Sequence, residues 1–302
     1  MASRSVFLEK ILALPRRWFV SVNPFWRSTV FGLLLASASV AYGQRWDYGP
    51  YAGGTGYFGD LNLHTSLRFF GPAAGAYVRY NLDERVSFRV SGGQGRIWGD
   101  DAFSPDYVHR VRNLRFFSPI TEGTLQTEFN FLPYYNTSNS SHTDPHLFTP
   151  YLFAGFSVFH FNPMTHYADE KVLLQPLGTE GQGYSQYPEL KRYRRTSTAF
   201  VIGGGFKWRV ARRIGMFAEA GIRKTATDYL DDVSGVYADP VVLFYEGSPM
   251  VAYLADPSGD VAGEPVGKPG KMRGDASKND DYLLAAVGIS FTIRPYRCPY
   301  KE

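Results

Sequence analysis

The stretch LFTPYLFAGFSVFHFNP, Leu147–Pro163, decides the fold because its side chains change character at every second residue. One set of alternate positions is purely apolar: Leu152, Ala154, Phe156 and Val158. The intervening positions are aromatic or small: Tyr151, Phe153, Gly155 and Ser157. Alternation with a period of two is typical of a β-strand that has a different environment on each face. We expect the first set to face lipid and the second to fill the interior of a barrel.

The same alternation recurs along the chain and predicts eight strands. They are expected near residues 46–60, 72–82, 85–99, 114–133, 147–162, 197–210, 214–229 and 281–294. The links at 82–85 and 210–213 are short, the link at 134–146 is intermediate, and four are long: 61–71, 100–113, 163–196 and 230–280. Short turns at one end and mostly long loops at the other are typical of outer-membrane barrels. The sequence therefore predicts an all-β fold, an eight-stranded antiparallel up-and-down transmembrane β-barrel with long extracellular loops, in contact with the lipid of the cell outer membrane.

The composition agrees with a strand-rich chain, since 302 residues include 31 Gly, 21 Tyr and 23 Phe. A soluble sandwich or a lipocalin-like barrel would alternate in the same way and is the alternative. Aromatic residues near the strand ends favour the membrane barrel, because such residues gather at the two membrane interfaces. They are Trp46, Tyr80, Tyr134, Trp208, Tyr229 and Tyr282.

The N-terminus has the pattern of a secretory signal. Arg27 precedes an apolar run over 30–41, and small residues stand before an expected cut ahead of Gln44. We expect residues 1–43 to be a signal peptide with an extended leader, 44–294 the barrel with a long loop insert at about 230–280, and 295–302 a C-terminal tail. Cys298 is the one cysteine, so an intramolecular disulfide bond is excluded.

The interior of the predicted barrel should be a plug rather than a pore, because eight strands leave a lumen just wide enough for side chains. Its expected inward charges nearly balance and permit buried ion pairs: Arg79, Arg89, Lys207, Arg209 and Arg223 with Glu122, Glu128 and Glu219. No nucleophile stands with a base, so we expect no catalytic residue. Gly203–Gly205 lacks the helix of a phosphate loop, and basic residues form no nucleic-acid stripe, so neither a nucleotide nor nucleic acid is expected.

Acidic residues cluster where the strands meet the long links, and we expect them to share one rim. They are Asp60, Asp100, Asp101, Asp228, Asp231, Asp232, Asp280 and Asp281. Crowded carboxylates need compensation by cations. We favour pairing with Arg112, Arg115 and Arg223. The alternative is calcium, with Asp228, Asp231 and Asp232 as candidate ligands; no other cofactor is expected.

Several segments carry a family resemblance. They are GYFGDLN at 56–62, FTPYLFAGFSVFHFNP at 148–163, QPLGTEGQG at 175–183, RKTATDYLDDVSGVY at 223–237 and SKNDDYL at 277–283. Together they resemble PorG, the small outer-membrane barrel component of the type IX secretion system. The insert at 241–271 and the tail beyond 294 depart from the family pattern. The resemblance brings no catalytic residues.

What the resemblance implies is a role in assembly: association with the periplasmic ring of the lipoprotein PorK and its partner PorN, in support of protein export. The expected contacts are on the periplasmic turns, where the candidate partner-binding residues are Asp83, Glu84, Asn136, Asp144, Arg212 and Arg213. Two other interpretations stay open. One is a stand-alone barrel that binds surface ligands or stabilises the envelope, and the other is a lipid-modifying barrel enzyme.

Overall fold

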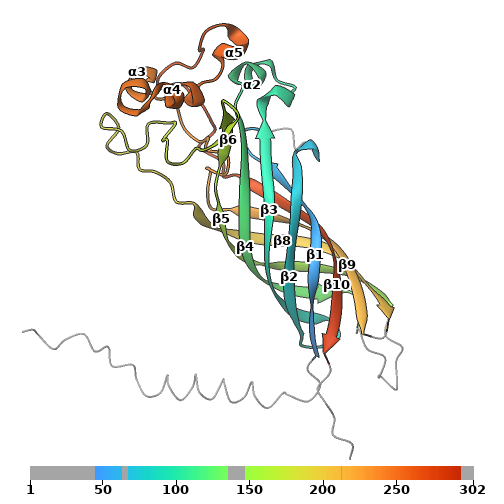
Figure 1. Cartoon of the computed structure of the whole chain (residues 1–302). Coiled ribbons are helices and arrows are strands. Elements are labelled where there is room, and N and C mark those ends of the chain that lie inside the picture. Colours follow the sequence, from blue (N-terminus) through green and yellow to red (C-terminus); the bar gives the residue numbers. More distant parts are fainter. Residues whose placement is uncertain (1–44, 63–66, 135–146, 212, 294–302) are drawn as a thin grey trace, which may run out of the picture. The chain divides into compact units, whose positions relative to one another are not determined.

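The computed structural model describes residues 45–62, 67–134, 147–211 and 213–293, and these form a closed antiparallel β-barrel (Figure 1). Its eight strands are β1 Arg45–Phe58, β2 Phe70–Asn81, β3 Val86–Asp100, β4 Arg115–Asn130, β5 Phe148–Phe161, β8 Thr196–Ala211, β9 Ile214–Thr225 and β10 Asp281–Ile293. They pair in the order β3-β2-β1-β10-β9-β8-β5-β4, and β4 pairs with β3 to close the ring. The predicted eight-stranded up-and-down barrel is confirmed. The expected signal segment and C-terminal tail lie outside the described residues.

The inside and the outside of the wall follow the alternation of the sequence. On β5, Leu152, Phe156 and Val158 are 54, 70 and 57% exposed, whereas Tyr151 and Ser157 are each 1% exposed. The outward positions of the other strands are likewise apolar and exposed; examples are Val78, Val90, Leu125, Ile202, Phe206 and Val287. Such a wall requires an apolar solvent, because soluble proteins rarely expose a continuous apolar band.

The aromatic residues expected at the strand ends are only partly on the outer wall. Trp46 and Tyr80 are in contact there, with ring centroids 4.9 Å apart. Tyr282 is fully buried, because it lies at an inward position of β10. Tyr134 is buried as well, and Tyr229 lies beyond the end of β9, where it stacks on Tyr193 at 4.4 Å. For these three tyrosines the prediction of an interface position is wrong.

Gly203 and Gly205 on β8 serve close packing. A Cβ atom at Gly203 would lie 2.3 Å from the carbonyl oxygen of Ala220 and 2.4 Å from the ring of Phe153. A Cβ atom at Gly205 would lie 2.3 Å from the carbonyl oxygen of Ala218. The glycines therefore let β8 and β9 approach beneath inward-facing aromatic rings.

Two ends of the barrel differ in what joins the strands. At the turn end, named for its short links, lie the first residues of β1 and the last of β10. The loop end carries the long links and all the other elements. These are η1 Leu67–Phe69, η2 Asp101–Phe103, α2 Tyr107–Arg112, β6 Met164–Tyr167, β7 Glu170–Leu173, α3 Pro240–Val242, the π-helical turn η3 Leu243–Gly247, α4 Pro249–Ala255 and α5 Gly259–Ala262. No described helix is long and apolar enough to cross a membrane.

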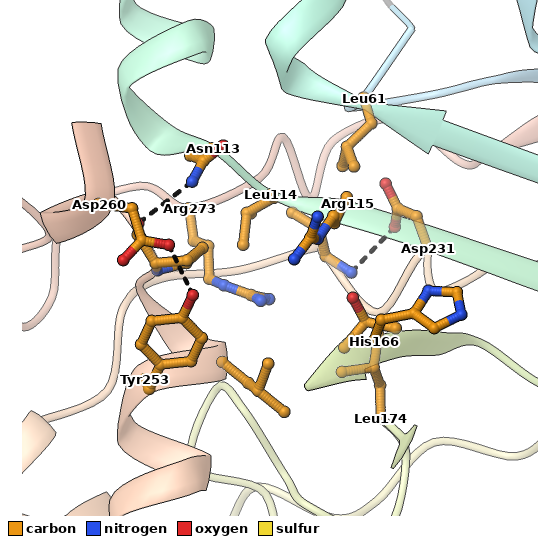
Figure 2. A pocket seen from close by; sticks show the side chains of 14 residues that line it. Leu61, Asn113, Leu114, Arg115, His166, Leu174, Asp231, Tyr253, Asp260 and Arg273 are labelled. Atoms are coloured by element: carbon orange, nitrogen blue, oxygen red, sulfur yellow. Dashed lines mark hydrogen bonds between the residues drawn. The ribbon is translucent and has the colours of Figure 1, made fainter. Parts of the chain in front are cut away.

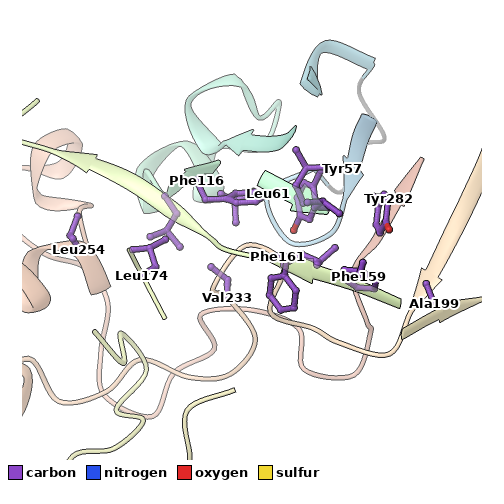
Figure 3. Close-up of a cluster of buried hydrophobic side chains, with 14 residues drawn as sticks. Tyr57, Leu61, Phe116, Phe159, Phe161, Leu174, Ala199, Val233, Leu254 and Tyr282 are labelled. Atoms are coloured by element: carbon purple, nitrogen blue, oxygen red, sulfur yellow. The ribbon is translucent and has the colours of Figure 1, made fainter. Parts of the chain in front are cut away.

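The long links fold into one body at the loop end, which we call the cap: residues 59–62, 101–114, 162–195 and 226–280. Its core is a cluster of buried apolar side chains drawn from strand ends and loops (Figure 3): Tyr57, Leu61, Phe116, Phe161, Leu174, Val233 and Leu254 among them. A second cluster packs Leu243, Val251 and Ala255 of the helical insert against Leu177 and Tyr187. The insert at 241–271 is thus a folded part of the cap.

Candidate functional site

Glu128 is the centre of a network of ion pairs in the lumen. Its carboxylate is fully buried and lies 2.6 Å from Lys207 Nζ, 2.8 Å from Arg79 Nε and 3.1 Å from Arg89 Nε. The Lys207 ammonium donates a hydrogen bond to it, whereas the two Nε–H groups are not aligned to do so and contribute as charges. Lys207 also donates to Asn130 Oδ1 at 2.9 Å.

The remaining carboxylates of the lumen extend this network. Glu219 pairs with Arg89 at 2.5 Å and accepts from the hydroxyl of Tyr151. Glu122 pairs with Arg223 at 3.1 Å and accepts from Tyr282 at 2.7 Å.

Asp47 completes the network beside Arg79, at 3.6 Å, so the lumen pairs join four cations to four carboxylates. A cavity beside Glu122 and Tyr282 measures only about 10 Å³, room for about one ordered water. The predicted plug and its inward charges are confirmed, except that Arg209 is only half-buried.

Two buried carboxyl groups meet one tyrosine at the base of the cap. The hydroxyl of Tyr57 lies 2.5 Å from Asp231 Oδ2 and 3.1 Å from Asp280 Oδ1. Burial raises the pKa of Asp231 and of Asp280 well above the usual range. The charge of Asp60 raises the pKa of Asp231 further, and the charge of Asp231 raises the pKa of Asp280 further. The hydroxyl of Tyr57 thus bridges two carboxyl groups whose protonated forms are favoured by burial.

Two arginines hold the rest of the cap together. Arg112 forms a bidentate ion pair with Asp101 at 2.7 and 2.9 Å, and it also donates to the carbonyl oxygens of Asp60 and Arg273. Arg273 donates to Glu180 Oε1 at 3.1 Å and to the carbonyl oxygen of Asp232 at 2.7 Å. Links far apart in sequence are therefore joined by charge-assisted hydrogen bonds.

Glu180 and Asp232 connect the 175–183 segment to the 223–237 segment. Glu180 accepts from the backbone N–H groups of Ser234 and Gly235, each within 3.1 Å. Asp232 accepts from the hydroxyl groups of Thr179 and Tyr193, both at 2.6 Å. Burial raises the pKa of Asp232 to about 6.

The rim acids do not converge on a point where a metal ion could bind. Asp231 points to Tyr57 and Asp232 to Thr179 and Tyr193, while Asp228 keeps one buried oxygen without a partner and has a pKa raised by burial to about 7. Within the described ranges, no three acidic, His or Cys side chains are arranged to hold a metal ion. The geometry gives no support to the calcium hypothesis.

Pairing of the rim acids with arginine is confirmed for Arg112 with Asp101 and is wrong for Arg223. Arg223 points into the lumen and pairs with Glu122, because it occupies an inward position of β9. Asp281 instead pairs with Lys224, and Asp100 accepts from the N–H of Ala102 at the start of η2.

A small cavity inside the cap has room for one or two waters. It measures about 30 Å³ and lies among Arg115, His166, Leu174 and Tyr253 (Figure 2), and Tyr253 donates to Asp260 at 2.6 Å. Tyr57, Glu180 and Arg273, which hold the cap together, were not identified as site residues from the sequence. The signal that pointed to this region was the set of resembling segments.

The candidate partner-binding residues that the structure describes lie at the turn end. Asp83 accepts from the N–H groups of Arg85 and Val86 and so shapes the first turn. The carbonyl oxygen of Glu84 accepts from Tyr134 N, which brings the 82–85 turn beside the 131–134 segment. Arg213 is exposed. The other three candidates, Asn136, Asp144 and Arg212, lie outside the described residues.

The closed sheet, the apolar outer wall and the filled lumen define a membrane-spanning β-barrel of the outer-membrane type. Residues 27–239 match the family described as a domain of unknown function, DUF6089, and the chain belongs to this family. The match ends at the residue before α3, so the helical insert follows the matched part.

No curated protein matches the chain. Among solved structures it is similar to Neisserial surface protein A, with a TM-score of 0.39, 10% identity and coverage of 82% of this chain and 98% of that one. It is also similar to the outer membrane protein OprG from Pseudomonas aeruginosa, with a TM-score of 0.38, 9% identity and coverage of 84 and 97%. These likenesses are of fold alone, and the barrel assignment rests on the strand pairing above.

Proposed function

We propose that this chain is a non-enzymatic outer-membrane component of the type IX protein secretion machinery that associates with the periplasmic ring proteins PorK and PorN. In this proposal the barrel spans the outer membrane, the cap faces outward and the turn end faces the periplasm. The chain serves as an anchor and a docking element and is not a conduit for cargo.

The observation that carries the proposal is the convergence of four resembling segments in the cap. Tyr57 belongs to the 56–62 segment, Glu180 to the 175–183 segment, Asp231 to the 223–237 segment and Asp280 to the 277–283 segment. Tyr57 contacts both aspartates, and Glu180 binds the backbone beside Asp231. Four of the five resembling segments therefore meet in one buried, interlocking unit, while the fifth, 148–163, runs along β5. The meeting of four segments supports a shared architecture more strongly than separate matching loops would.

The lumen supports an anchoring role. Its four cations and four carboxylates each lie within 4 Å of an opposite charge, so that among these described groups none is left unpaired to guide a solute. A barrel with a filled interior acts through its surfaces.

Docking to a periplasmic ring requires contacts at the turn end, while four of the five resembling segments lie at the other end. We assign the two ends different tasks: the cap orders the outer loops, and the turn end meets the ring. Glu84 and Arg213 supply charges at that end, and charges at the edge of an interface steer association.

The test is affinity purification of the full chain from envelopes that contain the ring proteins. Reversing the turn-end charges with Glu84→Lys and Arg213→Glu should lower recovery of PorK and PorN severalfold and reduce cargo secretion. The matched control reverses two exposed cap charges, Glu264→Lys and Lys268→Glu, and should leave recovery unchanged.

Three other outcomes have distinct meanings. If the turn-end variant recovers PorK and PorN as wild type does, the 136–144 link becomes the expected docking surface. Replacing that link with a two-residue hairpin turn then tests it. Equal loss with the cap control would move docking to the cap. If wild type never recovers the ring proteins, the stand-alone barrel with a role in the envelope is the better account.

A further inference from the structure

A groove on the outer face of the barrel wall lies beside the β6–β7 hairpin of the cap and takes no part in the lumen network. It lies where β2, β3 and β4 rise past the apolar band and meet β6, and its volume is about 460 Å³. Its lining combines aromatic and basic side chains: Phe70, Trp98, Phe117, Arg96, Arg115 and His166. We call it the outer groove.

The outer groove begins at the upper edge of the apolar band. Neighbouring strands place four exposed polar residues side by side in one row: Gln94, Thr121, His160 and Thr196. Directly below this row the outward positions are Gly92, Gly123, Val158 and Thr198, and the next row down is wholly apolar: Val90, Leu125, Phe156 and Phe200. Arg96 stands two residues above Gln94, which is about 5 Å along the barrel axis for a tilted strand. Arg96 therefore stands at the height expected for lipid headgroups.

Phe117 forms an aromatic platform for the cations of the outer groove. The guanidinium of Arg96 lies 4.5 Å from its ring centroid, and Lys171 Nζ lies 5.8 Å from it. The ring of His166 contacts it at 4.9 Å. Phe117 is an outward residue, yet it is 8% exposed because β6 pairs with β4 at this point through Met164.

The basic side chains here are not neutralised by neighbours. Arg96, Arg115 and Lys171 are exposed, and within the described part of the chain none has a carboxylate within 4 Å. Asp100 lines the groove opposite Arg115, but its side chain accepts from the N–H of Ala102 at the start of η2. Two arginines that line the groove, together with Lys171 beside the ring of Phe117, therefore outnumber the one carboxylate of the lining, Asp100.

We propose that the outer groove binds the phosphorylated headgroup of a lipid in the leaflet that surrounds the loop end of the barrel. Guanidinium groups bind phosphate oxygens in pairs, and lysine adds a point charge. Trp98 and Phe70 provide the amphipathic ring surface that is favoured at this depth. The occupant is a lipid and not a soluble anion because the groove is continuous with the apolar band, where acyl chains lie.

The test measures lipid retention by native mass spectrometry of the full chain released from phosphatidylcholine nanodiscs that contain lipid A, a lipid with phosphate monoesters. Arg96→Ala, Arg115→Ala and Lys171→Ala are combined in one variant. Retention of lipid A should fall about tenfold to hundredfold, since each cation near a membrane surface contributes a factor of roughly five. Dephosphorylated lipid A should be retained by wild type no better than by the variant.

The matched control removes three exposed cap cations, Lys191→Ala, Lys268→Ala and Lys271→Ala, and should retain lipid A as wild type does. Heat-modifiable migration of both variants verifies that the barrel is folded. Equal retention by the groove variant and wild type would overturn the proposal, as would equal retention of lipid A with and without its phosphates. Complete displacement of lipid A by inorganic phosphate at equal concentration would make the groove a soluble-anion site and overturn the lipid assignment.

Discussion

Replacing Glu128 with Gln tests whether the lumen network carries the stability of the barrel. The substitution keeps the shape of the side chain and removes one negative charge from a fully buried position. Three cations lie within 3.1 Å of that carboxylate: Arg79, Arg89 and Lys207. The magnitude of the effect depends on how many of them keep another partner.

The three cations are not equally dependent on Glu128. Arg89 keeps Glu219 at 2.5 Å, and Arg79 keeps Asp47 at 3.6 Å. Among the described residues, Lys207 keeps the amide oxygen of Asn130 and the ring face of Tyr151 at 4.3 Å, but no other carboxylate. The variant therefore leaves one uncompensated buried cation, and breaking a buried ion pair in this way costs about 3–5 kcal/mol. With a denaturant slope of about 2 kcal/mol per M in urea, the unfolding midpoint should fall by about 1.5–2.5 M.

The assay is urea unfolding of the barrel in lipid vesicles, followed by heat-modifiable migration. The double variant Glu128→Gln with Lys207→Met should recover most of the loss, because replacing a buried ion pair by uncharged groups is often neutral. Glu170→Gln, an exposed change on the β6–β7 hairpin, is the control without an expected shift. An unchanged midpoint for Glu128→Gln, or a double variant less stable than the single one, would refute the reasoning.

Two further predictions concern the wall and the cap. Phe156→Arg should lower the yield of folding into lipid vesicles, because an arginine on the lipid face costs about 2–4 kcal/mol. Phe156→Leu should leave the yield unchanged. Equal yields for the two variants would contradict a lipid-facing position. Because burial raises the pKa of Asp231 and Asp280, the folded cap binds protons that the unfolded chain releases, so its stability is greatest at acidic pH and falls as the pH rises through the raised values. Limited proteolysis of the cap should be slower at about pH 5 than at about pH 8, and Asp280→Asn should flatten this difference. A steeper difference in the variant would contradict the assignment of the pH dependence to this buried pair.

The barrel could be predicted from the sequence because the polarity of each residue in the wall matches the side of the sheet that it faces. Leu152 and Tyr151 differ in burial for the same reason that they differ in chemistry, namely that successive residues of a strand face opposite sides. The ion-pairing residues of the lumen, such as Glu128 and Lys207, followed from the same alternation. Their actual pairing did not, because the relative height of two strands depends on the register between them.

The contacts of the cap could not be predicted in this way, because they join long links whose sequences have no regular alternation of polar and apolar residues. Tyr57 lies in a strand as predicted, and Asp231 was expected to pair with an arginine or to bind calcium, but the contact that buries the two against each other was not predicted. Arg223 was placed correctly on the inner face, but the sequence left both a lumen glutamate and a rim aspartate open as its partner, and the structure pairs it with Glu122. An arginine reaches several carboxylates, and only the three-dimensional arrangement selects one.

Buried and exposed cations of this protein differ in whether a carboxylate lies beside them, and this difference indicates where a ligand can bind. Buried cations in the lumen and at the base of the cap, such as Lys207 and Arg112, are each held by a carboxylate, so a ligand that enters either place would have to break an existing pair. Exposed cations such as Arg96 and Arg115 have no such partner within 4 Å in the described ranges and can bind an anion without that cost. Recognition is therefore expected on the outer wall and at the turn end, and the interior holds these surfaces in place.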